Sequence, residues 1–186
     1  MLRCMSLTRR YWEVDSMIVE SSEQVATIRE TILHNAEKSM VVLKKCADDL
    51  PAMQFFAELK FGKMGRDPLT GRELNMIEQI NQMYSDIVAL SAVQDLLDQY
   101  PGKKFEMHLG STAGYDIQST DGEVIAECFA VTSVNSNDKI NKDCRKLRKA
   151  QALYKHLYFC TYRDSEKVLQ NKFEKYPEIQ LKRVYY

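Results

Sequence analysis

"GYDIQSTDGEVIAECFAVTSVNSNDKINKD", residues 114–143, is the stretch from which the fold and the candidate chemistry follow. Two strand-like runs flank Asp121-Gly122, a dipeptide that favours a tight turn, so the segment is predicted to form a β-hairpin. Asp116 lies in the first run, and Glu127 lies in the middle of the second, eleven residues later. The second run is apolar enough to be a central strand, which makes the carboxylate of Glu127 conspicuous.

The sequence around the hairpin predicts further helices and strands. Before it, residues 72–99 repeat apolar side chains at helical spacing, with Thr70 as a cap and Pro101-Gly102 as the end of one long helix. Residues 103–110 then alternate in polarity as a half-buried strand does. After the hairpin we expect a helix over 137–154, a strand over 156–162, a helix over 165–176 and a strand over 179–186. From residue 72 the predicted order is helix, three strands, helix, strand, helix, strand.

Residues 1–71 are predicted to form an N-terminal helical extension. Ser22 to Ala47 has a helix-forming composition with Ser22 as its N-cap, and another helix is expected over 51–59. No linker or repeat separates this region from residues 72–186. We therefore expect one compact α/β domain in which the helices pack on a core with a small mixed sheet.

The composition of the sequence restricts the classes of protein to which this chain can belong. The 26 basic residues balance 26 acidic ones, so a site for a polyanion must be local. The five cysteines are widely spaced and form no cluster of zinc-site spacing, which is typical of reduced thiols in a cytoplasm. The sequence has no run of about 18 apolar residues, and no apolar stretch typical of a signal peptide. We expect a soluble, cytoplasmic protein without a membrane segment.

Two carboxylates near the ends of paired strands can hold a hard divalent cation. Oxygen ligands suit Mg²⁺ or Mn²⁺, and a phosphodiester can complete the coordination shell. Glu127 is the stronger signal, because a carboxylate inside an apolar strand is costly to bury unless it is paired or bound to metal. A structural ion pair between Glu127 and Lys139 is the alternative, and Asp116 alone would be an ordinary strand-end residue.

These residues, in this order of elements, resemble the PD-(D/E)XK, or restriction-endonuclease-like, nuclease superfamily. The resemblance rests on GYD ending at Asp116, on GEVIAECF containing Glu127, and on an αβββαβ order over residues 72–162. It implies a metal-dependent nuclease acting on DNA, with Asp116 and Glu127 as ligands of Mg²⁺ or Mn²⁺. Members of the superfamily often supply another acid from the first core helix. Glu73 is expected to be this third ligand, because at about 100° per residue it lies near the apolar stripe of that helix.

Phe129 departs from the pattern of the superfamily, which places a lysine two residues after the glutamate. Residues 127 and 129 share a strand face, so the active-site side would carry a ring in place of an ammonium group. The following helix offers Lys139 and Lys142 as displaced catalytic lysines. Lys139 is preferred, and its amine is expected within about 5 Å of the Glu127 carboxylate.

The same helix carries a basic face that would bind the DNA backbone through clustered cations. Its members are Lys142, Arg145, Lys146 and Lys149. An ordinary solvated helix face explains this cluster equally well.

Two other functions stay open: a catalytically inactive nuclease-fold protein that binds nucleic acid or a protein partner, and a helical interaction module in which the acids are incidental. The N-terminal helices are the expected surface for a homo-oligomer or a protein partner.

Overall fold

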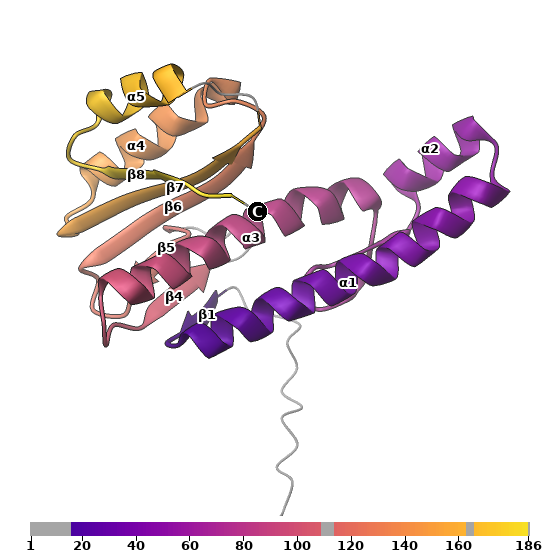
Figure 1. Cartoon of the computed structure of the whole chain (residues 1–186), viewed down its shortest axis with the longest axis horizontal. Helices are drawn as coiled ribbons and strands as arrows, with labels where there is room; N and C mark the ends of the chain where they lie inside the picture. The colour runs from indigo at the N-terminus through magenta and orange to yellow at the C-terminus, as the bar shows by residue number, and fades with distance from the viewer. Residues whose placement is uncertain (1–15, 109–113, 163–165, 186) are drawn as a thin grey trace, which may run out of the picture.

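The structure, a computed structural model, describes residues 16–108, 114–162 and 166–185. Within these ranges the chain forms a six-stranded sheet with helices on both faces (Figure 1). In the order in which they pair, the strands are β1 (Ser16–Val19), β4 (Phe105–His108), β5 (Ile117–Ser119), β6 (Val124–Val131), β7 (Tyr154–Thr161) and β8 (Gln180–Arg183). The helices are α1 (Ser22–Asp49), α2 (Ala52–Phe61), α3 (Met76–Gln99), α4 (Lys139–Lys149) and α5 (Glu166–Lys175). A separate ribbon pairs β2 (Gly65–Arg66) with β3 (Glu73–Leu74).

The predicted α/β class with a mixed sheet is confirmed. Strands β1, β4, β5 and β6 pair antiparallel, whereas β7 and β8 run parallel to β6. Elements α3, β4, β5, β6, α4 and β7 follow one another in the predicted order. Parallel neighbours need a crossover connection, which α4 supplies between β6 and β7 and α5 between β7 and β8.

Each face of the sheet buries its own apolar cluster, because side chains alternate along the strands. On β6, Ala126 and Cys128 pack in the cluster that contains α1 and α3, whereas Ile125 and Phe129 pack in the cluster that contains α4 and α5. Figure 1 shows α3 on one side of the sheet and α4 and α5 on the other. Glu127 lies between Ile125 and Phe129, so its side chain faces α4.

Helix α3 begins later than the sequence predicts. Its first residue is Met76, and the N-cap is Asn75, whose side chain accepts a hydrogen bond from the backbone N–H of Glu78. The predicted start at residue 72 is wrong because residues 73–74 pair in the β2–β3 ribbon. The predicted apolar stripe is correct only in part, since Ile77 is 49% exposed whereas Leu90 is fully buried. The buried residues with which α3 packs on the sheet are concentrated from Ile87 onward.

Helix α1 matches its predicted extent, but its cap is one residue earlier. Ser21, not Ser22, is the N-cap, and its side chain accepts a hydrogen bond from the backbone N–H of Gln24. Val25 and Ile32 of α1 are buried in the cluster shared with α3. Strand β1, just before α1, is not predicted from the sequence, yet it forms the edge of the sheet beside β4.

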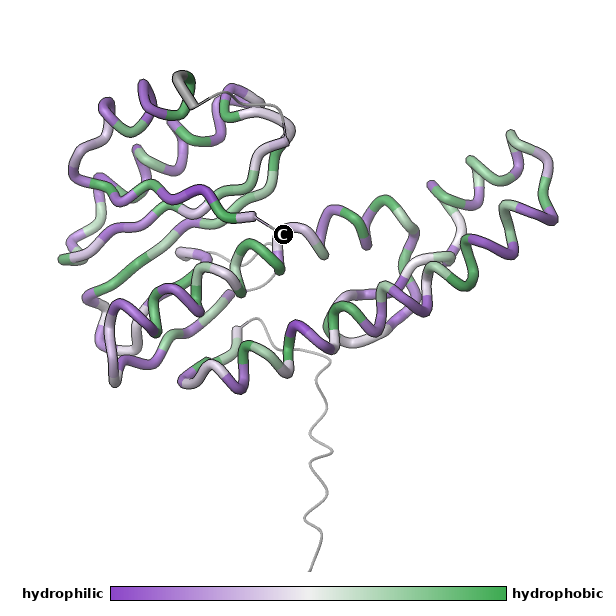
Figure 2. The backbone as a smooth tube through the Cα atoms, in the orientation of Figure 1, coloured by the Kyte–Doolittle hydropathy of each residue, from purple (hydrophilic) through white to green (hydrophobic). Residues whose placement is uncertain are grey.

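Apolar and polar residues alternate along α1 and α3, as the green and purple segments of Figure 2 show. This pattern fits helices that are packed on one side and solvated on the other. No helix formed by the described residues is long and apolar enough to cross a membrane. Large apolar side chains are exposed on α1 and α2, including Val41, Met53 and Phe61. The expected partner surface on these helices stays a prediction.

Helix α4 is shorter than predicted at both ends. It starts at Lys139, after a 3₁₀ turn over Ser136–Asp138, and ends at Lys149. Asn137 and Asp138 have φ values of 53° and 54°, a left-handed backbone that Asn and Asp tolerate better than most residues. These two residues therefore set where the helix begins and which of its side chains face β6.

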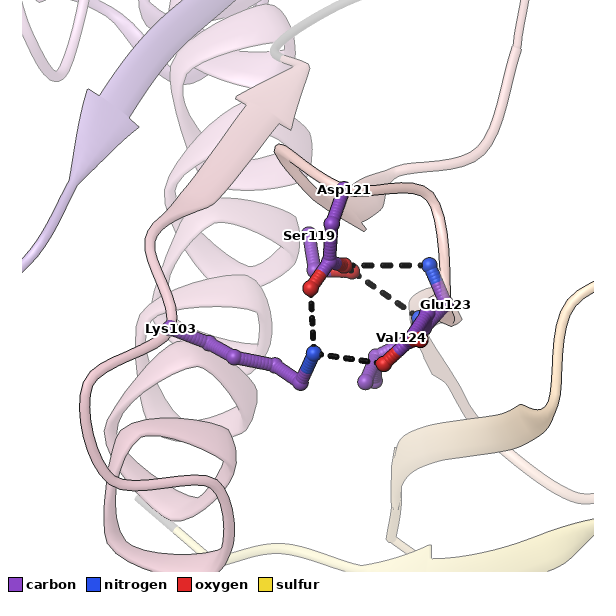
Figure 3. Close-up of polar contacts among 5 residues, drawn as sticks. All are labelled: Lys103, Ser119, Asp121, Glu123 and Val124. Atoms are coloured by element: carbon purple, nitrogen blue, oxygen red, sulfur yellow. Dashed lines mark hydrogen bonds and ion pairs between the residues drawn. The ribbon is translucent and has the colours of Figure 1, made fainter.

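The turn of the β5–β6 hairpin is closed by a compact polar network (Figure 3). Lys103 forms ion pairs with Asp121 and Glu123. Asp121 also accepts hydrogen bonds from the Ser119 hydroxyl at 2.6 Å and from the backbone N–H of Glu123 at 3.1 Å. The hydrogen bond from Lys103 is the main reason that the pKa of Asp121 lies below its usual range. The hairpin is thus fixed at the end remote from Asp116 and Glu127.

Burial of His156 on β7 predicts acid-sensitive stability. His156 is 1% exposed, its Nε2 lies 2.9 Å from the Tyr100 hydroxyl, and burial lowers its pKa to about 4. The unfolded chain takes up this proton below about pH 6.5, whereas the folded chain resists it until about pH 4. Stability is therefore expected to fall by about 3 kcal/mol as the pH drops through this window.

Urea unfolding at several pH values measures this loss, with His156→Gln as the matched variant. Glutamine keeps a polar partner for Tyr100 but does not titrate, so the variant is expected to lose less stability on acidification. The difference between the two proteins isolates His156 from the carboxyl groups that also titrate. Equal pH dependence in both proteins would contradict the assignment.

Candidate functional site

The register of the hairpin brings Asp116 and Glu127 together. Ile117 pairs with Ala126 across β5 and β6, so continuing the antiparallel register by one residue sets Asp116 opposite Glu127. Side chains at directly opposed positions have Cβ atoms about 5 Å apart. Asp116 is held there by two hydrogen bonds: its Oδ2 accepts from the Cys128 backbone N–H at 2.7 Å, and its carbonyl accepts from the His108 N–H at 2.8 Å.

Glu127 is buried and faces Lys146 of α4. Its side chain is 3% exposed, and its Oε1 lies 2.5 Å from Lys146 Nζ. Burial raises the pKa of Glu127 to about 7, the nearby Asp116 and Asp143 carboxylates add to this rise, and Lys146 opposes it. Lys146 also donates a hydrogen bond to the Gly114 carbonyl and lies 5.2 Å from the centre of the Tyr115 ring. One lysine thus ties α4 to β6 and to the residues just before β5.

Asp143 and Lys139 form a second pair beside the first. Lys139 Nζ lies 3.1 Å from both carboxylate oxygens of Asp143, which is buried. Burial raises the pKa of Asp143, and so does Asp116, whereas Lys139 lowers it. Three carboxylates, Asp116, Glu127 and Asp143, therefore share a small region with two ammonium groups.

Lys139 lies over the residue that replaces the lysine of the superfamily pattern. Its Nζ is 5.7 Å from the centre of the Phe129 ring. Phe129 is 4% exposed and stacks on Phe159 of β7, so its ring belongs to the core beneath α4. The charged neighbours of Glu127 are Lys146, Asp116 and Asp143, and the expected pairing of Glu127 with Lys139 is replaced by the pair Lys146–Glu127.

A cleft of about 330 Å³ opens beside these groups. It lies where β6 runs on past its pairing with β5, and its walls come from α3, β4, β6 and the start of α4. Asp116 and Lys139 line it, together with His108, Asn137 and Asp86 of α3. Asp86 is buried, and burial raises its pKa to about 7. The cleft is therefore bordered by carboxyl groups from a helix and from the hairpin.

The predicted third ligand and second lysine lie elsewhere. Glu73 was expected on the long helix, but it is exposed in β3 and does not line the cleft. The reason is the later start of α3 at Met76, which leaves residue 73 in the ribbon. Lys142 is exposed on α4 and does not line the cleft either. Asp86 is the acidic residue of α3 that lines the cleft.

The basic face of α4 is partly neutralised. Arg145 is paired with Asp138 at 3.2 Å, and Lys146 is paired with Glu127. Within the described residues, Lys142 and Lys149 make no ion pair, and both are exposed. These two lysines are the members of the predicted cluster that keep their charges available to a phosphate backbone.

Sequence reasoning missed Asp86 and Asp143, although both leave a signal. Asp86 lies one turn from Met83 and one turn from Leu90, on the apolar side of α3. Asp143 shares the apolar side of α4 with Ile140 and Leu147. A carboxylate on the buried side of a helix indicates a paired or functional group in the same way as Glu127 does in its strand.

The donor set fits a hard cation that keeps part of its water shell. Oε1 of Glu127 and Oδ2 of Asp143 are buried, and each lies within ion-pair distance of a lysine, Lys146 and Lys139 respectively. Among the described residues no three His, Cys, Asp or Glu side chains form a ready-made metal site. Asp116 and Glu127 fit Mg²⁺, which commonly takes one or two protein carboxylates with water and phosphate oxygens.

Cys128 and His108 are two other polar residues that line the cleft. Burial raises the pKa of the Cys128 thiol well above its usual range, so this cysteine lacks the thiolate that a nucleophile needs. His108 lines the cleft from β4, and its Nδ1 is buried without a hydrogen bond from the described residues. The cleft therefore offers carboxylates, an ammonium group and an imidazole.

No protein-family model matches the sequence, and no curated protein is significantly similar to it. The resemblance to the restriction-endonuclease-like superfamily rests on the hairpin, its two acids and the order of elements.

Proposed function

We propose that this protein is a nuclease that hydrolyses phosphodiester bonds in DNA with Mg²⁺ or Mn²⁺, and that its core is of the restriction-endonuclease-like type. The observation that carries the proposal is the hairpin register, which, continued by one residue, sets Asp116, a residue that lines the cleft, opposite the buried Glu127. The αβββαβ order, with β7 parallel to β6, supports it.

Asp116 and Glu127 are the proposed metal ligands. A bound divalent cation would polarise the phosphodiester and lower the pKa of an attacking water. Glu127 is paired with Lys146, which offsets the cost of burying the carboxylate. The Cys128 N–H fixes one oxygen of Asp116 and so orients its carboxylate.

Lys139 is the proposed replacement for the lysine that Phe129 displaces. It reaches the Phe129 ring from α4, lines the cleft with Asp116, and is oriented by Asp143. From this position its ammonium group can hold the attacking water or stabilise charge that develops on the phosphate. Lys142 and Lys149, exposed on the same helix, would contact the DNA backbone farther from the reacting bond.

A cleavage assay on plasmid and single-stranded DNA tests the proposal. With Mg²⁺ or Mn²⁺ we expect cleavage that increases with protein concentration, and with EDTA in place of the metal we expect none. The products are resolved on denaturing gels. Cleavage that persists in EDTA would contradict the metal-dependent mechanism.

The second candidate function is a nuclease-fold protein without activity, and one contact favours it. Lys146 lies 2.5 Å from Glu127 and competes with a cation for that carboxylate. This alternative predicts no cleavage with either metal. It also predicts that nucleic acid, or a protein partner, binds equally well with metal or with EDTA.

A further inference from the structure

A second cavity adjoins the cleft at the carboxyl ends of β6 and β7. Its volume is about 260 Å³, and it shares Ala130 and Val131 of β6 with the cleft. The remaining walls come from the first half of α3 and from the residues that follow β6 and β7. In α/β proteins, ligands commonly bind beyond the carboxyl ends of parallel strands. The two cavities therefore form one continuous surface that leads away from Asp116.

Two tyrosines give the second cavity an aromatic lining. Tyr162 follows β7 directly, and its backbone N–H donates to the Thr132 carbonyl at 3.2 Å, which fixes the residue at the cavity. The side chain of Tyr162 is nevertheless 76% exposed. Tyr84 lines the same cavity from α3 and is half-buried. An exposed aromatic ring on a fixed backbone position, beside a second ring, suits stacking with a planar ligand.

Asn81 adds a polar group to this lining. It lies on α3 one turn before Tyr84, and its side-chain amide makes no hydrogen bond within the described residues. An amide presents both donors and an acceptor, which is the pattern needed to pair with the edge of a nucleobase.

We propose that this second cavity binds an unpaired nucleobase next to the phosphodiester held at Asp116 and Glu127. The inference rests on the proposed nuclease function and adds a substrate class to it: single-stranded or locally unpaired DNA. Bases inside a duplex have both faces covered by their neighbours, so they cannot stack on Tyr162 unless they leave the helix. Stacking on a side chain does not depend on the sequence of the strand.

Binding of a fluorescent oligothymidine in EDTA tests the proposal without cleavage of the probe. We expect the wild-type protein to bind the single strand more tightly than a duplex of equal length. Tyr162→Ala is expected to weaken single-strand binding by about 5- to 150-fold, the range for loss of one stacked base. Tyr162→Phe keeps the ring and is expected to bind as the wild type does. Tyr185→Ala removes a tyrosine that is 69% exposed but lines neither cavity, and it serves as the matched control.

Three results of the binding assay overturn the inference: preference of the wild type for duplex, wild-type affinity in Tyr162→Ala, or equal losses in Tyr162→Ala and Tyr185→Ala. Failure of the nuclease proposal is distinguishable, because it shows as absent cleavage while single-strand binding still depends on Tyr162. Conversely, metal-dependent cleavage that is unaffected by Tyr162→Ala and faster on duplex would retain the nuclease and reject the base site. Thermal unfolding of each variant establishes that the fold is intact.

Discussion

Asp116→Asn is expected to lower metal-dependent DNA cleavage at least about 10³-fold, the loss of roughly 4 kcal/mol of transition-state stabilisation. Asparagine has nearly the same shape, and its side-chain oxygen can still accept the hydrogen bond from the Cys128 N–H. The end of β5 should therefore keep its position. What is lost is the negative charge that would bind the cation. Rates under single-turnover conditions measure the effect on chemistry rather than on product release.

Asp121→Asn is the matched control for this substitution. Asp121 is a carboxylate of the same hairpin, but it lies in the turn with Lys103 and Glu123, at the end remote from the cleft (Figure 3). The control is expected to cleave at the wild-type rate, with at most a modest loss of stability. If Asp116→Asn cleaves as fast as Asp121→Asn, Asp116 holds no catalytic cation and the inactive or incidental interpretations gain weight.

Much of the fold could be predicted because polar and apolar residues in its central segment follow patterns typical of strands and tight turns. Asp121-Gly122 marks the turn, alternation in residues 103–110 marks β4, and the apolar run around Glu127 marks a strand covered on both faces. Strand β1 was missed because four residues show too little alternation to be distinguished from a loop. The β2–β3 ribbon, which makes α3 begin later than predicted, was missed because two-residue strands are too short to show an alternating pattern.

The positions of Asp116 and Glu127 in the hairpin could be predicted from the sequence, but the contacts of the α4 lysines with them could not. Pairing across a tight turn fixes the register, so Asp116 and Glu127 follow from sequence spacing. Which lysine reaches Glu127 depends on where α4 starts and how it crosses β6. The left-handed residues Asn137 and Asp138 set that start, and in the resulting orientation of the helix Lys146 pairs with Glu127. No period in the sequence specifies this rotation.

Phe129→Lys, which restores the lysine of the superfamily pattern, is expected to destabilise the protein by about 3–5 kcal/mol. The Phe129 ring is 4% exposed and stacks on Phe159 with 5.9 Å between ring centres. A lysine at this position would lose that packing and bring a second ammonium group close to Lys139. The free energy of unfolding in urea measures the loss. Phe129→Leu, which keeps an apolar side chain, is expected to lose about 1.5 kcal/mol or less.

Lys139→Met provides the complementary measurement. Some stability is expected to be lost, because Lys139 pairs with the buried Asp143, while cleavage by the folded variant is expected to fall about 10²-fold. If Lys139 is the displaced catalytic lysine, removing it should lower the rate of cleavage, and placing a lysine at residue 129 should lower the free energy of unfolding. If Phe129→Lys were instead as stable as the wild type and cleaved DNA faster, Phe129 would mark a lost catalytic lysine. Lys139 would then serve only to neutralise Asp143. If Lys139 already occupied the catalytic position, a second lysine at residue 129 would not be expected to increase the rate of cleavage.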